Sequence, residues 1–153
     1  MSQLPVIRPA TPDDLPDILR LYALPDFDDG RALPLDEAQE RFDRLRRYPD
    51  YHLYVAQLRG RTVGTFALLI MEKLLHLGAP AAIVDDVIVD TDCRGQGIGR
   101  QMMQFAMQLA RKKGCYKLAL STNVKRTAAH HFYESLGFAR HGYSYIVDLE
   151  RPA

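Results

Sequence analysis

Apolar positions recur along this chain with two different periods, and the changes of period mark its predicted elements. Alternating or short continuous apolar segments are typical of strands, whereas apolar residues three and four positions apart are typical of one helix face. Strands are predicted at Pro5–Arg8, Tyr51–Leu58, Thr62–Ile70, Ala81–Val89, Tyr116–Leu120 and Tyr143–Leu149. Helices are predicted at Thr11–Tyr22, Leu35–Arg47, Gly97–Lys113 and Arg126–Leu136. This order of elements places the chain in the α/β (α+β) class.

The sharpest local signal lies where a strand pattern leads directly into three glycines and then into the longest helix. The glycines occupy alternate positions, Gly95, Gly97 and Gly99. Glycine has no Cβ, so backbone N–H groups can turn toward a ligand, and a helix start leaves its first N–H groups unpaired. A helix start also carries a partial positive charge. The stretch therefore predicts a binding site for an anion, most often a phosphate or pyrophosphate.

Two common nucleotide-binding loops do not fit these glycines. A dinucleotide fingerprint, Gly-x-Gly-x-x-Gly, would need glycine at Arg100 or at Met102. A Walker loop would need Gly-Lys-Ser/Thr, which does not follow here. The pattern that does fit is Arg-x-x-Gly-x-Gly, from Arg94 to Gly99.

Length and composition predict one globular domain over residues 1–153. The chain is 47% hydrophobic and 25% charged, as in ordinary globular proteins. Its net charge of +1 argues against a general nucleic-acid or membrane binder, and it shows no membrane-spanning run or signal-peptide pattern. Because Cys93 and Cys115 form no Cys-x-x-Cys pair, a reducing cytoplasm is the expected location.

The charges are divided unevenly along the chain. Residues 1–92 hold 16 acidic and 10 basic residues, whereas residues 93–133 hold eight basic residues and no acidic one. The second stretch includes the glycine loop and the longest predicted helix. Because the charged residues of this stretch are all positive, they support an anionic ligand at the loop.

Two motifs together resemble the GCN5-related N-acetyltransferases (GNAT), which transfer acetyl from acetyl-coenzyme A to an amine. The first is Arg94–Gly99, and the second, Ala129–Phe138, is similar to the family's late Ala-x-x-x-Tyr-x-x-x-Gly-Phe motif. The resemblance covers residues 62–138 well and the earlier residues only by the order of elements. It implies the GNAT acyl-CoA N-acyltransferase fold, a mixed central sheet of six to seven strands flanked by four helices. In that fold the fourth and fifth strands splay apart around the cofactor.

The resemblance also implies how acetyl-CoA is held. Main-chain groups of Val87, Ile88 and Val89 would pair with the pantetheine like an added strand, and an N–H group there would polarise the thioester carbonyl. The pyrophosphate would be bound by N–H groups of Arg94, Gly95, Gln96, Gly97, Ile98, Gly99 and Arg100. Arg126 stands where the commonest late motif has Asn, and Asn123 lies three residues earlier, so both are candidates for a phosphate contact.

Acetyl transfer to an amine needs a base for the ammonium proton and a donor for the departing thiolate. Tyr133 lies at the family position for the second role, with a packed core tyrosine as the alternative. Asp86 and Asp85 are candidates for the base, because carboxylates within an apolar strand need a partner, and alternation predicts opposite faces for them. The alternative is a structural carboxylate, and His76 is a less favoured base.

Further details are similar to small-molecule members of the family. Asp85–Val89 together with Gly114–Lys117 look like glucosamine-phosphate and aminoalkylphosphonate acetyltransferases, whereas the usual base of histone-modifying members is replaced by Ile83. We therefore expect direct transfer from acetyl-CoA to a primary amine of a small molecule in a ternary complex. A protein or peptide acetyltransferase and a non-catalytic acyl-CoA sensor are the alternatives.

Partners and surroundings follow from the same expectation. No metal is expected, because no His-x-x-x-His spacing occurs. Nucleic acid and membrane are not expected partners, and a homodimer is a common arrangement of this fold. The acidic residues Asp26, Asp28 and Asp29 lie in a connection that borders the acceptor site in this family, where they would attract a cationic amine. An ordinary solvated loop is the alternative.

Overall fold

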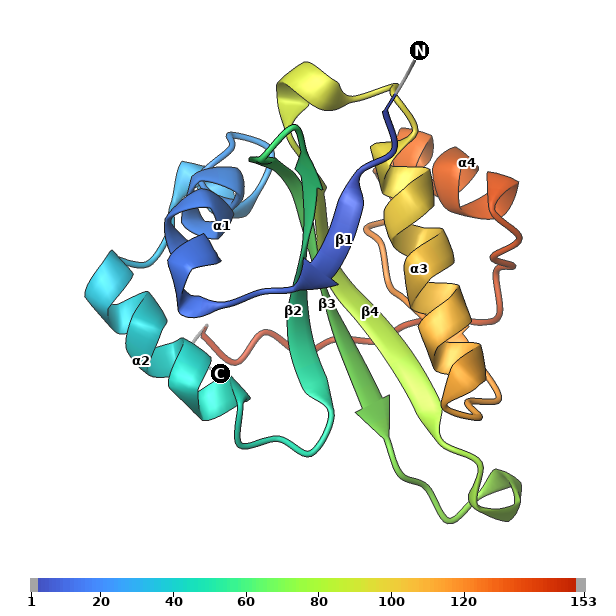
Figure 1. Ribbon diagram of the computed structural model, residues 1–153. Helices are drawn as coiled ribbons and strands as arrows, with labels where there is room; N and C mark the ends of the chain where they lie inside the picture. Colours follow the sequence, from blue (N-terminus) through green and yellow to red (C-terminus); the bar gives the residue numbers. More distant parts are fainter. Residues whose placement is uncertain (1–2, 151–153) are drawn as a thin grey trace. The chain divides into compact units, whose positions relative to one another are not determined.

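The computed structural model describes residues 3–150, so residues 1–2 and 151–153 of the predicted domain lie outside the described part (Figure 1). Residues up to Leu120 form one compact unit, and residues from Ser121 form a second.

The first unit is built on a five-stranded sheet in which the spatial order of the strands is their order along the chain. The strands are β1 (Val6–Pro9), β2 (Tyr51–Leu58), β3 (Arg61–Met71), β4 (Ala81–Val89) and β5 (Leu118–Ala119). Neighbours among the first four run antiparallel, whereas β5 pairs with β4 in parallel through Leu118 and Ala119 only. Since this pairing ends at Ile83, the later part of β4 is left without β5 as a neighbour, as the predicted splay requires.

Helices cover both faces of this sheet. Helices α1 (Leu15–Tyr22) and α2 (Leu35–Leu45) lie on one side, and α3 (Ile98–Lys112) lies on the other (Figure 1). The α1–α2 side is filled by a core of Leu15, Ile18, Phe42 and Val55. On the α3 side an aromatic cluster joins β2, β3 and α3, and its members are Tyr54, Phe66 and Phe105.

Helix α1 begins after the predicted Thr11 cap, although its first turn, Pro12–Asp14, is a 3-10 turn. The carboxylate of Asp14 accepts the Thr11 N–H at 2.7 Å and binds both terminal nitrogens of Arg8 at 2.7 and 2.8 Å. The hydrogen bond from Arg8 is the main cause of the lowered pKa of Asp14. These contacts attach the start of α1 to β1, which fixes the helix over the sheet.

The sheet has five strands rather than the predicted six to seven. The segment Tyr143–Leu149 forms no strand, and its large apolar side chains are 77–92% exposed. The predicted strand at Tyr116–Leu120 is reduced to Leu118–Ala119. A strand requires the backbone groups of a neighbouring strand, and an alternating sequence pattern contains no information on whether such a neighbour exists.

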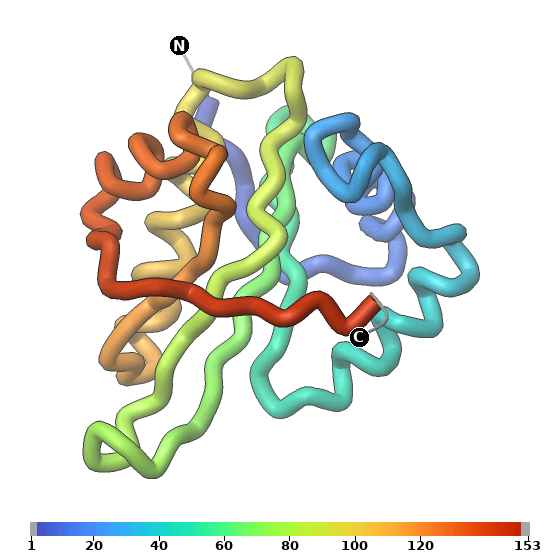
Figure 2. The backbone as a smooth tube through the Cα atoms, turned by 180° about the vertical axis from the view of Figure 1, so that it is seen from behind, coloured from blue at the N-terminus to red at the C-terminus, as the bar shows by residue number. Residues whose placement is uncertain are grey.

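The second unit contains α4 (Thr127–Ser135), the fourth α-helix of the described chain. Beyond α4 the chain continues as an extended segment toward the C-terminus (Figure 2). The ring of Tyr133 contacts Phe132 and Phe138 edge-on, at centroid distances of 5.0 and 5.6 Å. The late motif therefore forms a local aromatic cluster around the tyrosine.

Gly64 of β3 lies directly against Met102 of α3. A Cβ at this position would lie 2.8 Å from Met102 Sδ and 3.3 Å from the carbonyl oxygen of Ile88. Because Met102 is fully buried, we expect Gly64→Ala to lower the free energy of unfolding by about 1–3 kcal/mol. Urea unfolding checks this. The control Gly142→Ala, with nothing within 4 Å of its Cβ, should stay close to the wild type. A Gly64→Ala midpoint equal to that of the wild type would contradict the expectation.

Candidate active site

The glycine loop, Arg94–Gly97, joins the end of β4 and a 3-10 turn to the start of α3. Gly95 and Gly97 have φ angles of +78° and +82°, in the left-handed region that favours glycine. A Cβ on either residue would meet nothing within 4 Å. Both glycines are therefore required by backbone conformation, and the open space over them leaves room for a ligand.

The loop presents a row of unpaired N–H groups. Within the described residues, the N–H groups of Gly95, Gln96 and Gly97 form no hydrogen bond. The N–H groups of Ile98–Arg100 follow in the first turn of α3, where no intrahelical acceptor is available. Such a row at the positive end of a helix is suited to a diphosphate, as predicted from the glycine spacing.

The acidic connection between α1 and α2 lies against this loop. Asp26 forms an ion pair with Arg94, with 3.1 Å between Oδ2 and Nη1, and Asp28 binds Arg31 at 2.8 Å. The sequence left two interpretations of these acids open, an attraction for a cationic amine and an ordinary solvated loop. Because two of the three already face an arginine, the connection is a weak candidate for attracting an amine.

A β-bulge interrupts β4 at the two aspartates. Thr65 pairs with Ile88 and Ala67 with Asp85, so the intervening Phe66 faces both Asp86 and Val87. Asp86 takes a φ of +52°, and Oδ1 of Asp85 accepts its N–H at 2.9 Å. Strict alternation, which would send the two carboxylates to opposite faces, therefore does not apply here.

The register of the strands places Asp85 on the face covered by α1 and α2. Leu53 of β2 pairs with Ala67 of β3, which pairs with Asp85, and directly paired residues share a face. Leu53 packs against the α1–α2 core, and so does Tyr22 of α1. Tyr51 lies two residues before Leu53 on β2 and so points to the same face. Two tyrosines from different elements thus share a face with the bulge.

Electrostatics connects these groups. Burial raises the pKa of Asp86, and the charge of Asp85 raises it further, although solvent still reaches the Asp86 carboxyl. Burial also raises the pKa of Tyr22 and of Tyr51, and the charges of Asp86 and Asp85 add to both shifts. At neutral pH both phenols therefore remain hydrogen-bond donors beside the carboxylates.

No local feature of the sequence identified Tyr22 and Tyr51. Tyr22 fitted an apolar helix face, and Tyr51 fitted the start of an ordinary strand. They meet the aspartates only through the sheet register and the packing of α1, so only the tertiary structure could reveal them.

The late motif lies in the second unit, whereas the glycine loop and the bulge lie in the first. Asn123 organises the turn before α4, since its Oδ1 accepts the Lys125 N–H at 2.9 Å and its carbonyl oxygen accepts the Arg126 N–H at 3.0 Å. Nε2 of His130 is also 2.8 Å from that carbonyl oxygen. The Asn123 side-chain oxygen is therefore used within the turn that precedes α4.

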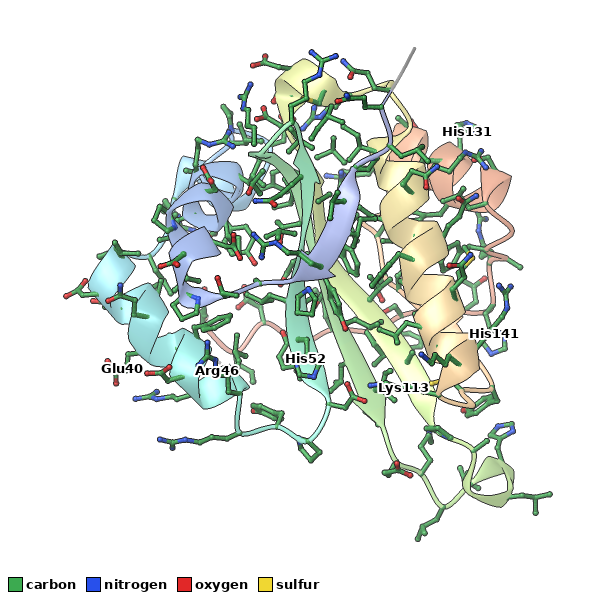
Figure 3. The ribbon with its side chains drawn as sticks, in the orientation of Figure 1. Glu40, Arg46, His52, Lys113, His131 and His141 are labelled. Carbon is green, nitrogen blue, oxygen red and sulfur yellow. The ribbon has the colours of Figure 1, made fainter. Side chains whose placement is uncertain are left out.

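The histidines are distributed over several elements and over both units. His52 lies on β2, whereas His131 and His141 belong to the second unit (Figure 3). His76, the less favoured base, stacks on the ring of Tyr116 at 3.9 Å. In the part of the chain that the structure describes, no three His, Cys, Asp or Glu side chains are grouped as metal ligands.

Two further features complete the description. Cys93 and Cys115 are both free thiols. Among residues 3–150, none of the helices has the length and apolar character needed to cross a membrane.

A mixed sheet that opens beside a glycine loop at a helix start defines an α/β protein with an edge whose free N–H groups are suited to an anion. Residues 15–138 match the sequence profile of the Acetyltransferase (GNAT) family, and the chain belongs to this family. The putative acetyltransferase from Agrobacterium tumefaciens str. C58 has a similar structure, with a TM-score of 0.87 and 33% identity over 94% of this chain and 99% of that one. The family resemblance and the fold class predicted from the two motifs are thus confirmed.

Two relatives whose names state an activity are also similar to this chain in sequence. The chain is 35% identical over 97 residues to the glucosamine 6-phosphate N-acetyltransferase of Trypanosoma brucei brucei, covering 63% of this chain and 64% of that protein. It is 33% identical over 101 residues to the aminoalkylphosphonate N-acetyltransferase of Salmonella typhimurium, covering 66% and 65%. The chain therefore spans somewhat less than two thirds of these relatives' lengths.

Proposed function

We propose that this protein is an acetyl-CoA-dependent N-acetyltransferase that transfers acetyl to the primary amine of a small molecule in a ternary complex. The observation that carries the proposal is the row of unpaired N–H groups in the glycine loop, which a single 3-10 turn separates from a strand with a bulge at two aspartates. Family membership and the small-amine substrates in the names of both relatives support it.

Acetyl-CoA would be held as a substrate along β4 and the glycine loop. The diphosphate accepts hydrogen bonds from the loop and from the first turn of α3. The pantetheine lies along Val87–Val89, where β4 has lost β5 as its neighbour, and pairs with free main-chain groups as an added strand. An N–H group of Val87 or Ile88 then polarises the thioester carbonyl.

The acceptor side is formed by the face that carries the bulge. Asp86 takes the proton of the ammonium group, because its raised pKa and its exposure suit a base that works in water-accessible surroundings. Asp85 holds the bulge through the Asp86 N–H. Tyr22 and Tyr51 border the incoming amine with their rings and phenols.

The reaction balances with these groups. The amine lone pair attacks the thioester carbon, a C–N bond forms and the C–S bond breaks. Asp86 accepts the first proton of the ammonium group and releases it to solvent, and it accepts the second proton when the attacking nitrogen loses it. Tyr133 donates its phenolic proton or a hydrogen bond to the departing thiolate, and a proton given up by the phenol is replaced from solvent. Asn123 and Arg126 both remain candidates for the remaining phosphate contact, because Asn123 Oδ1 accepts a hydrogen bond within its turn but its amide N–H groups can still donate.

The organisation of the whole chain is part of the proposal. The family match runs from residue 15 to residue 138 and so through both compact units, which supports one GNAT domain over residues 1–153. A cytoplasmic location and a homodimer remain predictions.

An acceptor screen tests the proposal. Purified protein is incubated with acetyl-CoA and single amines, and free thiol is measured. The panel contains glucosamine, glucosamine 6-phosphate, 2-aminoethylphosphonate, simple alkylamines and a lysine-containing peptide. Thiol release with a small amine supports the proposal, whereas release with the peptide alone supports the protein acetyltransferase. Tight acetyl-CoA binding by calorimetry with no release on any amine supports the sensor.

A further inference from the structure

Asp90 is a buried carboxylate at the junction between β4 and the turn that precedes the glycine loop. Asp90 as a whole is 3% exposed. Its Oδ2 accepts hydrogen bonds from Arg20 of α1 at 2.9 Å and from Arg61 of β3 at 3.1 Å. Burial alone would raise the pKa of Asp90, but the hydrogen bonds and charges around it hold that pKa below its usual value. The buried group is therefore an ion with two cationic partners.

The remaining polar groups of Asp90 direct the chain into the loop. Its N–H donates to the Val63 carbonyl oxygen at 2.8 Å, and its own carbonyl oxygen accepts the Cys93 N–H at 2.9 Å. Its Oδ1 accepts the Asp92 N–H at 3.4 Å. One residue thus fixes the end of β4 to β3 and shapes the 3-10 turn, Thr91–Cys93, that leads to Arg94.

Helix α1 secures this junction from outside the turn. Arg20 donates to the carboxylate of Asp90 and also to the Thr62 carbonyl oxygen at 2.9 Å. Just after α1, Asp26 holds the guanidinium of Arg94 at the first position of the loop. The entry to the loop is therefore held at two residues, Asp90 and Arg94, in the protein without a ligand.

The loop itself has little internal support. Gly95, Gln96 and Arg94 are exposed, and the N–H groups of Gly95–Gly97 have no partner among the described residues. Their direction must therefore depend on what holds the two ends of the loop, namely α3 on one side and Asp90 on the other. A loop ordered in advance loses less conformational freedom when its ligand binds.

We propose that Asp90, held by Arg20, is a positioning residue that orders the glycine loop for the diphosphate of coenzyme A without touching the ligand. The inference rests on the proposed function only in assigning coenzyme A to the loop, and it requires no acceptor amine. Its specific consequence is that loss of the Asp90–Arg20 contact weakens the diphosphate contacts and leaves the pantetheine contacts unchanged.

Calorimetry with two ligands separates this role from a merely structural one. CoA carries the diphosphate, whereas pantetheine ends before it. We expect Asp90→Asn and Arg20→Gln to raise the Kd of CoA by about ten- to a hundredfold, because the loop must then be ordered when the ligand binds. The Kd of pantetheine should stay within about twofold, since its contacts lie on β4. Arg20→Lys keeps the positive charge but loses the planar guanidinium that donates to two acceptors at once. Its Kd for CoA should therefore lie between those of Arg20→Gln and the wild type.

The control Asp17→Asn removes a more exposed carboxylate that also faces Arg20, at 3.6 Å, without touching Asp90. Its Kd for CoA should equal that of the wild type. Arg20→Gln leaves Arg61 paired with Asp90, so this variant gives a folded test if Asp90→Asn does not fold. Equal losses for CoA and pantetheine, or an unchanged Kd for CoA in a folded variant, overturn the inference alone. A wild type that binds neither ligand overturns the proposed function as well.

Discussion

Tyr133→Phe is expected to lower kcat for acetyl transfer by about a hundredfold or more, which is the usual contribution of a positioned proton donor. The substitution removes only the phenolic oxygen. The ring keeps its edge-on contacts with Phe132 and Phe138 and should therefore keep α4 and its surroundings folded. KM for acetyl-CoA should change little, because a donor to the thiolate acts mainly in the transition state.

Thiol release at saturating acetyl-CoA and acceptor measures this effect. Tyr145→Phe is the matched control, because Tyr145 is 88% exposed in the same unit. It should keep the wild-type kcat, and far-UV circular dichroism should show both variants folded. Full kcat in Tyr133→Phe would exclude the tyrosine as the acid and leave it as a packing residue of the late motif.

Asp86→Asn is expected to lower kcat/KM by about a hundredfold or more at neutral pH, because the amide cannot accept the ammonium proton. The backbone should tolerate the change, since asparagine adopts a φ of +52° more readily than most residues. Asp43→Asn, an exposed aspartate of α2, is the control and should keep wild-type kcat/KM.

The pH dependence gives this prediction a sign. A base works when deprotonated, so kcat/KM should fall as the pH drops through the pKa of Asp86. Because burial and the Asp85 charge raise that pKa, the fall should occur at a higher pH than the ordinary aspartate value of about 3.9. Asp85→Asn removes one cause of the shift, so the fall should move to lower pH. If kcat/KM falls at the same low pH in both aspartate variants as in the wild type, Asp86 is ruled out as the base.

Stability provides an independent check on the same residue. A carboxyl whose pKa is raised by folding favours the folded state fully below its unfolded pKa, and this contribution is lost as the pH rises through the folded pKa. At neutral pH the ionised Asp86 therefore opposes folding. Asp86→Asn should consequently unfold at the same temperature as the wild type or at a higher one. Lower stability together with lower activity would indicate a structural carboxylate instead.

Much of the fold could be predicted because its signals are local. The strands β2 and β3 and the turn between them follow from period-two patterns around Gly60, and α3 follows from helical periodicity up to Gly114. The glycine loop could also be predicted from adjacent residues, because the backbone conformations that it requires are ones that glycine permits. The strand predicted at Tyr143–Leu149 was wrong, because pairing depends on a neighbour and not on the segment itself.

The candidate site divides in the same way. By itself the sequence determined the anion-binding loop, the candidate carboxylates and the late tyrosine motif, since each is a short run whose chemistry is carried by adjacent residues. Only the tertiary structure decided that β4 forms a bulge at the two aspartates opposite Phe66 of β3, that Tyr22 and Tyr51 lie near them, and that Asp90 is held by Arg20. These relations join residues far apart in the chain. They arise from strand register and helix packing, which no local pattern encodes.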